Sequence, residues 1–596
     1  MTSARITAGR LRLTMIVVLA IIAVFIVRLV DLQVVRAEEL TTAAESRRTI
    51  AVPTYGERGS IVDANGTALA DSVERYDITA APANVDWETG RTAMMVDGAR
   101  VDVPTTEAIA KIAELTGAVA ADLQAALEAD RESLFAYLVK AVDLDTFTAV
   151  WDLDIGWVYS DMRPSRIYPS GAIAGNLVGF IGADEPLAGT ERRWDECLAA
   201  ENGESTYERG ADGVRLPGSL VVEKEPSDGG TVHLTIDADL QWFAQQKLAE
   251  RGTEVGADWG TAMVVRVATG EIVAAADWPS IDPNDLNSVG RNDAGARSFV
   301  APFEPGSIMK PVAFAALLDQ GLITPDTQLV VPGNYTEGLP AGENITDVFS
   351  HGDLRWTATG ILMNSSNIGT VMLSNRLTLQ QRYDYFQKFG FGQPTAVDFL
   401  GEDVDGNHGL VRTPGETASD SVTAATQMFG QGITATSAQM VSLYQTLGNG
   451  GVRMPLTLVS GCEHPDGTWT DVPVATGERV VSEYAADTTL QMMETVATQG
   501  GLRSVITVPD YRLAAKTGTG EVAENGRYGS ERIVSLAGVF PADAPEYAIV
   551  VTFAKPDIMK SSAAAAPTFN AIMEQVIKTF RVQPSREAAP ELPLTW

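Results

Sequence analysis

The sequence predicts an α+β fold, in which an antiparallel sheet flanked by helices follows a smaller mixed α/β module and one N-terminal transmembrane helix. Three observations support this class. An apolar run lies near the N-terminus, strand-like segments occur at both ends of the second half of the chain, and helical patterns lie between those ends. Helices inserted between the second and third strands of one sheet give a layered domain around a single core.

Composition excludes several other classes of protein. The chain has 596 residues, of which 45% are hydrophobic and 20% are charged, so it can bury substantial cores and is not disordered. Its formal net charge is −33. Because phosphate binding requires clustered lysine and arginine, nucleic acid is not expected as a partner.

The N-terminal apolar segment, residues 13–35, contains only Arg28 and Asp31 as charged residues and is long enough to cross a bilayer. Residues 1–12 contain no acidic residue and three basic ones, namely Arg5, Arg10 and Arg12. This charge bias predicts a single-pass plasma-membrane protein with a cytoplasmic N-terminus and with the rest of the chain outside. The alternative is a cleaved signal peptide, but no convincing cleavage site follows the apolar core, so an uncleaved anchor is favoured.

Two modules follow the anchor. Residues 36–230 show short strand patterns such as 76–79 and helical patterns such as 106–128, without a constellation of catalytic residue types. We interpret them as a non-catalytic pedestal that ends in a turn rich in Pro, Ser, Asp and Gly. Residues 231–582 form the second domain, and residues 583–596 form a Pro-rich tail.

The second domain begins and ends with strands. A hairpin of small and β-branched residues is expected at 261–267 and 272–276. Three apolar strands and a final helix are expected near the end, at 512–516, 533–540, 547–553 and 568–580. The residues between these groups read mostly as helices broken by Gly-rich loops.

Cysteine and histidine offer little as metal ligands or catalysts. Cys197 and Cys462 are the only cysteines, and we expect two free thiols in separate domains; the alternative is that they pair. The four histidines are far apart in the sequence and show no ligand spacing: His233, His351, His408 and His464. A zinc site or a Ser-His-Asp triad therefore has little support.

Ser307 and Lys310 form an S-x-x-K motif at the start of a helix that is apolar on every face, as in a buried central helix. Lys310 is expected one turn after Ser307 on the same face, and the helix N-terminus can stabilise an oxyanion. A buried lysine beside a second cation, here Lys516, has a lowered pKa and can be the base that a serine nucleophile needs. Taken alone, a helix cap and a solvated lysine explain this pair better.

Two further motifs follow in order. Ser365-Ser366-Asn367 spells S-x-N between helical segments, where a hydroxyl can relay a proton and an amide can hold a peptide. Lys516-Thr517-Gly518-Thr519 contains K-T-G at the end of a strand whose edge can pair with an extended peptide. Gly518 allows close approach, and the lysine and threonines can hold a carboxylate. An interhelical turn and a strand end are the ordinary explanations of these two motifs. Together with the helix cap that explains the first motif, all three must hold at once, which makes them jointly improbable.

S-x-x-K, S-x-N and K-T-G in this order resemble the active-site set of class B penicillin-binding proteins, the membrane-anchored peptidoglycan D,D-transpeptidases. Other segments are also similar to that family: Arg58–Gly66, Arg166–Pro169, Gly179–Gly182, Leu187–Glu191, Pro279–Asn284, Phe389–Gly392 and Gly430–Gly432. The resemblance implies a dimerisation-type pedestal on residues 36–230 and a penicillin-binding transpeptidase fold on residues 231–582.

The resemblance also implies a role for each motif residue. Ser307 would attack the penultimate D-alanine of a stem peptide, with Lys310 as base and Ser365 assisting release of the terminal D-alanine. Asn367 would position the donor peptide, and the oxyanion hole would comprise the N–H groups of Ser307 and Thr519. The remaining substrate-binding residues would be Lys516, Thr517, Gly518 and Thr519, of which the lysine and threonines hold the terminal carboxylate. β-Lactams would acylate the same serine, and no metal or organic cofactor is required.

The implied partners are peptidoglycan stem peptides on lipid-linked or nascent glycan, β-lactams, a membrane glycosyltransferase and other division proteins. The compact pedestal and the Pro-rich ending favour septal wall synthesis during cell division over elongation. Two alternatives share the motifs: a β-lactam-hydrolysing or β-lactam-sensing protein, and a non-catalytic scaffold of a wall-synthesis complex. Neither a hydrolase nor a sensor explains the long pedestal, and the scaffold is distinguished by whether Ser307→Ala retains crosslinking.

Overall fold

The computed structural model describes residues 2–40, 49–182, 185–208, 216, 218–286, 295–524 and 527–596, with the backbone alone for residues 2–8, 523, 524 and 527. The side chain of Arg5, counted above in the charge bias, lies outside the described residues. The chain divides into two compact units. One comprises residues 1–57 and 200–228, and the other comprises residues 58–199 and 229–596.

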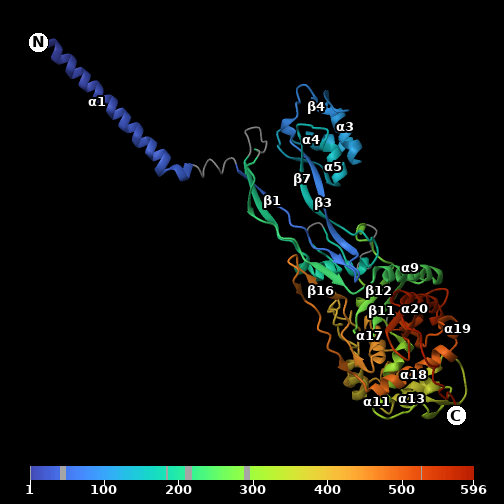
Figure 1. Ribbon diagram of the computed structural model, residues 1–596. Coiled ribbons are helices and arrows are strands. Elements are labelled where there is room, and N and C mark those ends of the chain that lie inside the picture. The colour runs from blue at the N-terminus through green and yellow to red at the C-terminus, as the bar shows by residue number, and fades with distance from the viewer. Residues whose placement is uncertain are drawn as a thin grey trace. The chain divides into compact units, whose positions relative to one another are not determined.

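The first unit contains the apolar N-terminal helix and a small sheet (Figure 1). Helix α1 (Thr2–Val30) continues into a π-helical turn (Asp31–Val35), and the segment Gly9–Val35 is long and apolar enough to cross a membrane. The sheet is antiparallel, in the order β1 (Thr49–Thr54), β8 (Gly203–Glu208), β9 (Val221–Lys224).

In the second unit, the part before residue 200 is built on the long strand β3 (Ala68–Ala80). This strand pairs antiparallel with β6 (Ala136–Val142) and β7 (Val158–Ile167). Three helices share the core of this sheet, namely α3 (Thr105–Thr116), α4 (Ala120–Glu128) and α5 (Leu144–Trp151). The helical pattern expected at 106–128 is two helices, because Gly117 adopts a left-handed conformation with φ of 72° and ends α3.

The two cysteines form a disulfide, so the expectation of two free thiols is wrong. Cys197 lies in α8 (Asp195–Leu198), and Cys462 lies in β16 (Val459–Glu463), with their Cα atoms 6.2 Å apart. The two residues are 265 positions apart in sequence. They meet because β10 (Thr231–Leu234) pairs with β16 while Gly230 N donates to Cys197 O at 2.7 Å. This long-range pairing has no local sequence signal.

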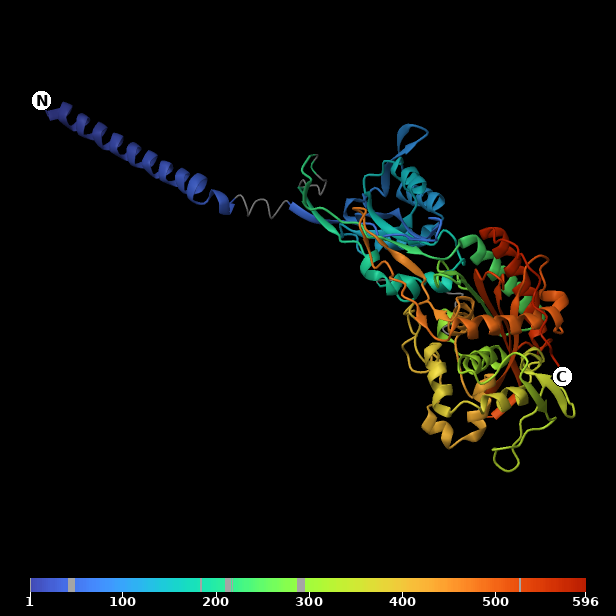
Figure 2. The ribbon, with the colours of Figure 1, turned by 60° about the horizontal axis from the view of Figure 1, so that its bottom comes forward.

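The core of residues 229–596 is a five-stranded antiparallel sheet in the order β12-β11-β21-β20-β19. Its strands are β11 (Trp259–Arg266), β12 (Ile272–Trp278), β19 (Ala514–Glu524), β20 (Arg527–Phe540) and β21 (Tyr547–Ala554). Strands from both ends of the domain lie side by side, as the sequence predicts, and Figure 2 shows the green first strands beside the red last ones. The K-T-G segment lies within β19, an edge strand that continues to Glu524, so the expectation that this segment ends a strand is wrong. The strand continues because residues 517–521 pair with β20.

Helices cover both faces of this sheet, with α9 and α17 on opposite sides of β11 (Figure 1). Alternate residues of β11 separate the two cores: Ala262 belongs to the core of α9 (Ala238–Val255) and α20 (Ala566–Phe580), whereas Met263 belongs to the core of α17 (Ser437–Gly448). Two further helices belong to the core of α17, namely α11 (Lys310–Asp319) and α18 (Glu483–Gln499), which contact each other. Residues 310–318 of α11 are all buried, which confirms the predicted central helix.

The C-terminal tail packs against the inserted helical region. Leu594 O accepts a hydrogen bond from Thr357 N at 3.1 Å, and Pro593 O accepts one from Thr357 Oγ1 at 2.6 Å. Thr357 is also the N-cap of α12 (Ala358–Met363), which leads into Ser365. The last residues of the chain therefore support the segment that carries the second motif.

The remaining elements are short. In the part before residue 200 they are β2 (Ile61–Val62), β4 (Arg91–Val96), β5 (Ala99–Pro104), α6 (Gly175–Val178) and α7 (Gly189–Arg193). In the later part they are α10 (Arg297–Val300), β13 (Gln328–Val331), β14 (Leu354–Thr357), α14 (Leu379–Lys388), α15 (Pro414–Ala418), α16 (Ser421–Thr426), β15 (Val452–Arg453), β17 (Trp469–Thr470), β18 (Glu478–Arg479) and α19 (Arg503–Ile506).

Candidate active site

Ser307 lies in the 3₁₀ turn Gly306–Met309, which leads directly into α11. The backbone of other segments presses against this turn. Gly306 has a φ of 56°, and a Cβ there would lie 2.7 Å from Thr519 O on β19. A Cβ on Gly430 would lie 2.1 Å from Gly306 O. Both positions require glycine because neither leaves room for a side chain.

Lys310 is fully buried, and its amine contacts the S-x-N segment. It bonds to Ser365 O, to Ser365 Oγ at 3.2 Å and to Asn367 Oδ1 at 2.8 Å. Burial lowers the pKa of Lys310 well below its usual value, and the charge of Lys516 lowers it further, whereas the charge of Asp347 raises it. The balance favours the neutral amine.

A neutral Lys310 fits these contacts. Its two N–H groups can donate to Ser365 O and to Asn367 Oδ1 or Ser365 Oγ, which leaves its lone pair for a hydroxyl proton. Among the described residues, the Ser307 hydroxyl has no hydrogen-bond partner and is partly exposed, so it is open to an incoming carbonyl. Lys310 follows Ser307 by one turn, as the sequence predicts.

The S-x-N segment is a tight turn between α12 and α13 (Asn367–Ser374). Ser365 has a φ of 57°, in the left-handed region that costs a non-glycine residue roughly 1–2 kcal/mol. Ser366 caps α13 by accepting from Gly369 N at 2.9 Å. The turn directs the Ser365 carbonyl, the Ser365 hydroxyl and the Asn367 amide at the Lys310 amine.

Lys516 is the second buried cation of the site. Its Nζ donates to Ser365 Oγ at 2.9 Å and to Thr517 O at 3.0 Å. Burial lowers the pKa of Lys516 to about 7. Two lysines thus converge on one hydroxyl, and their mutual repulsion disfavours the state in which both are charged.

The remaining K-T-G residues lie on the edge of β19 beside the Ser307 turn. A Cβ on Gly518 would lie 2.9 Å from Ile308 Cγ2 and 3.0 Å from Pro305 O, so glycine lets β19 approach this turn. Thr517 is half-buried and Thr519 is exposed. The predicted site residues therefore lie together, at the junction of one strand edge, one helix start and one interhelical turn.

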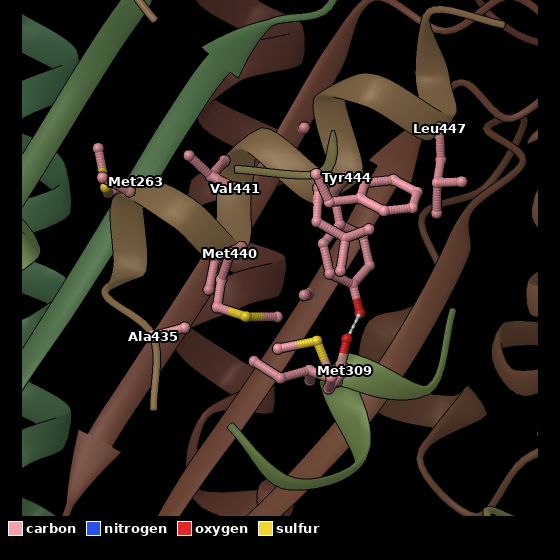
Figure 3. Close-up of a cluster of buried hydrophobic side chains, with 14 of the residues drawn as sticks. Met263, Met309, Ala435, Met440, Val441, Tyr444 and Leu447 are labelled. Carbon is pink, nitrogen blue, oxygen red and sulfur yellow. Dashed lines mark hydrogen bonds between the residues drawn. The ribbon is translucent and has the colours of Figure 1, made fainter. Parts of the chain in front are cut away.

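Tyr444 supports the Ser307 turn, although no sequence motif identifies it. It is fully buried on α17, and its hydroxyl donates to Ile308 O at 2.9 Å. Figure 3 shows this bond as a dashed line between Tyr444 and the turn that carries Met309, next to Met440 and Val441. From the sequence, a single tyrosine in an apolar helix is predicted to be an ordinary core residue. Only the contact between α17 and the turn reveals its role.

The site offers cations and hydrogen-bond donors instead of metal ligands. Within the described part of the chain, no group of three or more His, Cys, Asp and Glu side chains could hold a metal ion. Two buried lysines that meet at a serine hydroxyl, next to a second serine at a helix start, suit covalent chemistry on an anionic acyl substrate.

Comparison with known proteins identifies the family. Residues 260–574 match the penicillin binding protein transpeptidase domain, and residues 53–186 match the penicillin-binding protein dimerisation domain. The chain is 34% identical to penicillin-binding protein PbpB of Mycobacterium tuberculosis, over 97% of this chain and 86% of that protein. It is 30% identical to peptidoglycan D,D-transpeptidase FtsI of Escherichia coli, over 95% of this chain and 91% of that protein.

Solved structures agree with the sequence relatives. A peptidoglycan synthetase from Bifidobacterium adolescentis is 30% identical with a TM-score of 0.70, and covers 92% of this chain and 100% of its own. Penicillin-binding protein 3 from Mycobacterium tuberculosis, complexed with ampicillin, is 28% identical with a TM-score of 0.69, and covers 91% of this chain and 100% of its own. The chain therefore belongs to the penicillin-binding proteins that carry a transpeptidase domain.

Proposed function

We propose that Ser307 is the nucleophile of the peptidoglycan D,D-transpeptidase reaction, with Lys310 as its base. One observation carries this assignment: the Lys310 amine contacts Ser365 and Asn367, and Lys516 contacts the same Ser365 hydroxyl. The protein is a serine-type D-Ala-D-Ala transpeptidase. Its family binds β-lactams and peptidoglycan substrates.

The first half-reaction transfers an acyl group to Ser307. Neutral Lys310 takes the proton of the Ser307 hydroxyl while the oxygen attacks the carbonyl carbon of the penultimate D-alanine. The peptide C–N bond breaks, Ser365 passes a proton to the leaving amine and takes up the proton held by Lys310 in its place, and the terminal D-alanine departs. The N–H groups of Ser307 and Thr519 stabilise the oxyanion.

The second half-reaction forms the crosslink. The amine of a neighbouring stem peptide attacks the ester carbon and gives up a proton to Lys310. The ester C–O bond breaks as the new peptide bond forms, and the Ser307 oxygen takes the proton back from Lys310. A β-lactam follows only the first half, because its opened ring stays attached to the acyl group and no amine displaces it.

Substrate recognition involves the S-x-N turn and the edge of β19. The Asn367 amide positions the donor peptide, and the extended peptide lies beside the edge strand. Lys516 supplies a positive charge for the terminal carboxylate, and the hydroxyls of Thr517 and Thr519 supply hydrogen bonds. Gly518 lets this strand lie close to the Ser307 turn.

The proposed topology places the catalytic domain outside the plasma membrane. Residues 13–35 anchor the chain, residues 1–12 are cytoplasmic, residues 36–230 act as a dimerisation-type pedestal, residues 231–582 form the transpeptidase domain, and residues 583–596 form its tail. The basic N-terminus supports this orientation. The disulfide supports it too, because disulfides persist in oxidising surroundings.

The protein serves septal wall synthesis during cell division, a role supported by the relatives that carry the name FtsI. We propose that it works there with a membrane glycosyltransferase, which supplies nascent glycan, and with other division proteins. A fluorescent fusion should concentrate at the division site; uniform labelling of the cell outline would contradict the septal role.

Labelling of the full-length protein in detergent with a fluorescent penicillin tests the catalytic assignment. We expect one stable adduct, mapped to the peptide that contains Ser307, and no adduct in Ser307→Ala. The exposed serine variant Ser460→Ala is the control and should label normally. Rapid release of hydrolysed penicillin would instead indicate a β-lactam hydrolase, and normal crosslinking in cells that carry only Ser307→Ala would indicate a scaffold.

A further inference from the structure

Asp347 is a buried carboxylate that contacts the S-x-N segment but belongs to none of the motifs. Its side chain is 1% exposed. It accepts hydrogen bonds from Ser366 Oγ at 2.6 Å, from Asn367 N at 2.6 Å and from Ile368 N at 3.1 Å. A carboxylate from a distant segment therefore sits on the free N–H groups that begin α13, where negative charge is favourable.

His351 holds the other side of this carboxylate. Its Nε2 lies 3.1 Å from Asp347 Oδ2, and its Nδ1 lies 2.6 Å from Gly352 O. These two contacts fix the orientation of the ring between Asp347 and the backbone. The imidazole is 5% exposed and lies against the rings of Phe349 and Trp356, which limit the access of water.

The charge of Asp347 also acts on the catalytic centre. It raises the pKa of Lys310, against the larger effects of burial and of the Lys516 charge. The titratable groups around the S-x-N turn are Asp347 and His351 from the loop before β14, Lys310 from α11 and Lys516 from β19. The same carboxylate therefore holds the S-x-N backbone and counteracts the effect of the Lys516 charge on the pKa of Lys310.

We propose that Asp347 and His351 form a positioning pair for the catalytic centre. Asp347 fixes the turn that presents Ser365 and Asn367, and its charge acts on the Lys310 amine. His351 holds the Asp347 carboxylate in place. The electrostatic part rests on the function proposed above, in which neutral Lys310 is the base.

The test is the rate of acylation by a fluorescent penicillin as a function of pH, on the full-length protein. Asp347→Asn keeps the size and an oxygen acceptor but removes the charge. We expect a roughly tenfold slower acylation on the pH plateau, comparable to the loss of a strong helix cap. The acid limb should move to lower pH by roughly 0.5 unit or more, because Lys310 loses the charge that favours its protonated form.

Two variants make this result specific. Asp353→Asn removes an exposed carboxylate from the same loop and should match the wild type in rate and limb. His351→Gln removes the ring that holds Asp347 but leaves the carboxylate charge, so its rate should fall while its acid limb stays with that of the wild type. A limb that moves only in Asp347→Asn separates an electrostatic role from loss of folding, which the midpoint of thermal unfolding reports for each variant.

Several outcomes would overturn the proposal. Wild-type rates in folded Asp347→Asn would refute the positioning role, and a slower rate with an unmoved limb would refute the electrostatic role. If Asp347→Asn does not fold, a wild-type rate in folded His351→Gln decides against the positioning pair. Ser307→Ala, measured in the same series, reports on the proposed function separately, because label on that variant would refute the nucleophile and not the pair.

Discussion

Lys516 Nζ donates a hydrogen bond to the Ser365 hydroxyl at 2.9 Å, and Lys310 Nζ lies 3.2 Å from the same oxygen. One hydroxyl thus joins a sheet edge to the central helix. Because a hydroxyl can accept from one amine while it donates to the other, a proton can pass between the two lysines through Ser365. Its loss should therefore impair proton transfer more than folding.

Replacement of Ser365 tests this relay. Ser365→Gly removes the hydroxyl and accommodates the φ of 57° without strain, whereas Ser365→Ala removes the hydroxyl and keeps the strain. We expect both variants to slow acylation by a β-lactam by roughly 100-fold, the ordinary contribution of a positioned proton-transfer group. The rate constant of acylation, measured by quenched-flow labelling, checks this. Near-normal acylation in Ser365→Gly would mean that the backbone turn matters and the hydroxyl does not.

The pH dependence of substrate capture should depend on Lys516. Its pKa of about 7 lies below the ordinary value of 10.5, so the ammonium is present below pH 7 and is lost above it. A substrate that needs this cation for its carboxylate should therefore show kcat/KM falling as pH rises through about 7 in the free enzyme. The profile of a β-lactam with a free carboxylate, compared with that of its methyl ester, checks this. The same alkaline limb for acid and ester would contradict the role of Lys516.

Tyr444→Phe should slow acylation through the backbone of the Ser307 turn. The substitution leaves Ile308 O without its buried partner and should cost about 1–3 kcal/mol of unfolding free energy. Tyr385→Phe is the matched control, because Tyr385 donates to Asp319 at the far end of α11, the helix that follows the Ser307 turn. Both variants should lower the midpoint of thermal unfolding, but only Tyr444→Phe should slow acylation. Equal slowing in both would show that general destabilisation is the cause.

A buried carboxyl in β12 should make stability fall with rising pH. Burial raises the pKa of Asp277 to about 6, from the ordinary value of 3.8. Because the folded state binds this proton more tightly than the unfolded state, stability is highest below pH 4 for this group and falls as pH rises through 6. Asp277→Asn mimics the protonated form and should be more stable than the wild type by about 3 kcal/mol at pH 8.

The check is the difference in unfolding free energy between pH 5 and pH 8. Asp258→Asn, an exposed position near the start of β11, should follow the wild type at both values. If Asp277→Asn shows the same pH dependence as the wild type, the loss of stability arises elsewhere.

The disulfide should stabilise the second unit. It closes a loop of 265 positions, and in the chain-entropy account a loop of this length contributes about 5–6 kcal/mol. The double variant Cys197→Ala with Cys462→Ala should therefore unfold at a lower temperature, and a reductant should lower the midpoint of the wild type but not that of the variant. An unchanged midpoint on reduction would show that β10 and β16 hold these segments together without the bond.

Local patterns predicted the elements that form the catalytic sheet. The expected hairpin of residues 261–276 is β11 and β12, and the expected last strands are parts of β19 and β20 and all but the last residue of β21. The apolar residues of these strands were recognisable, whereas the polar stretches of β19 and β20 that pair with each other were not. The central helix α11 was predictable for the same reason. The motif residues were predictable because each motif fixes both residue type and spacing.

Features that depend on distant contacts could not be predicted from local patterns. The disulfide requires the register of β10 and β16, and the role of Tyr444 requires the contact between α17 and the Ser307 turn. Asp347 contacts residues about twenty positions later through the start of α13. The positive φ of Ser365 is likewise imposed by its two flanking helices and has no propensity of its own.

The pairing of β11 with β21 has a consequence for the synthesis of the protein. Val265 lies opposite Ala548, so the sheet cannot close until almost the whole chain has been made. Lys516 and the tail residues Pro593 and Leu594 also come late in the sequence. Such non-local pairing folds slowly, and an incomplete chain has Ser307 and Lys310 without the strand that completes their site. Capture of penicillin by a nascent chain therefore reports that synthesis has passed β21.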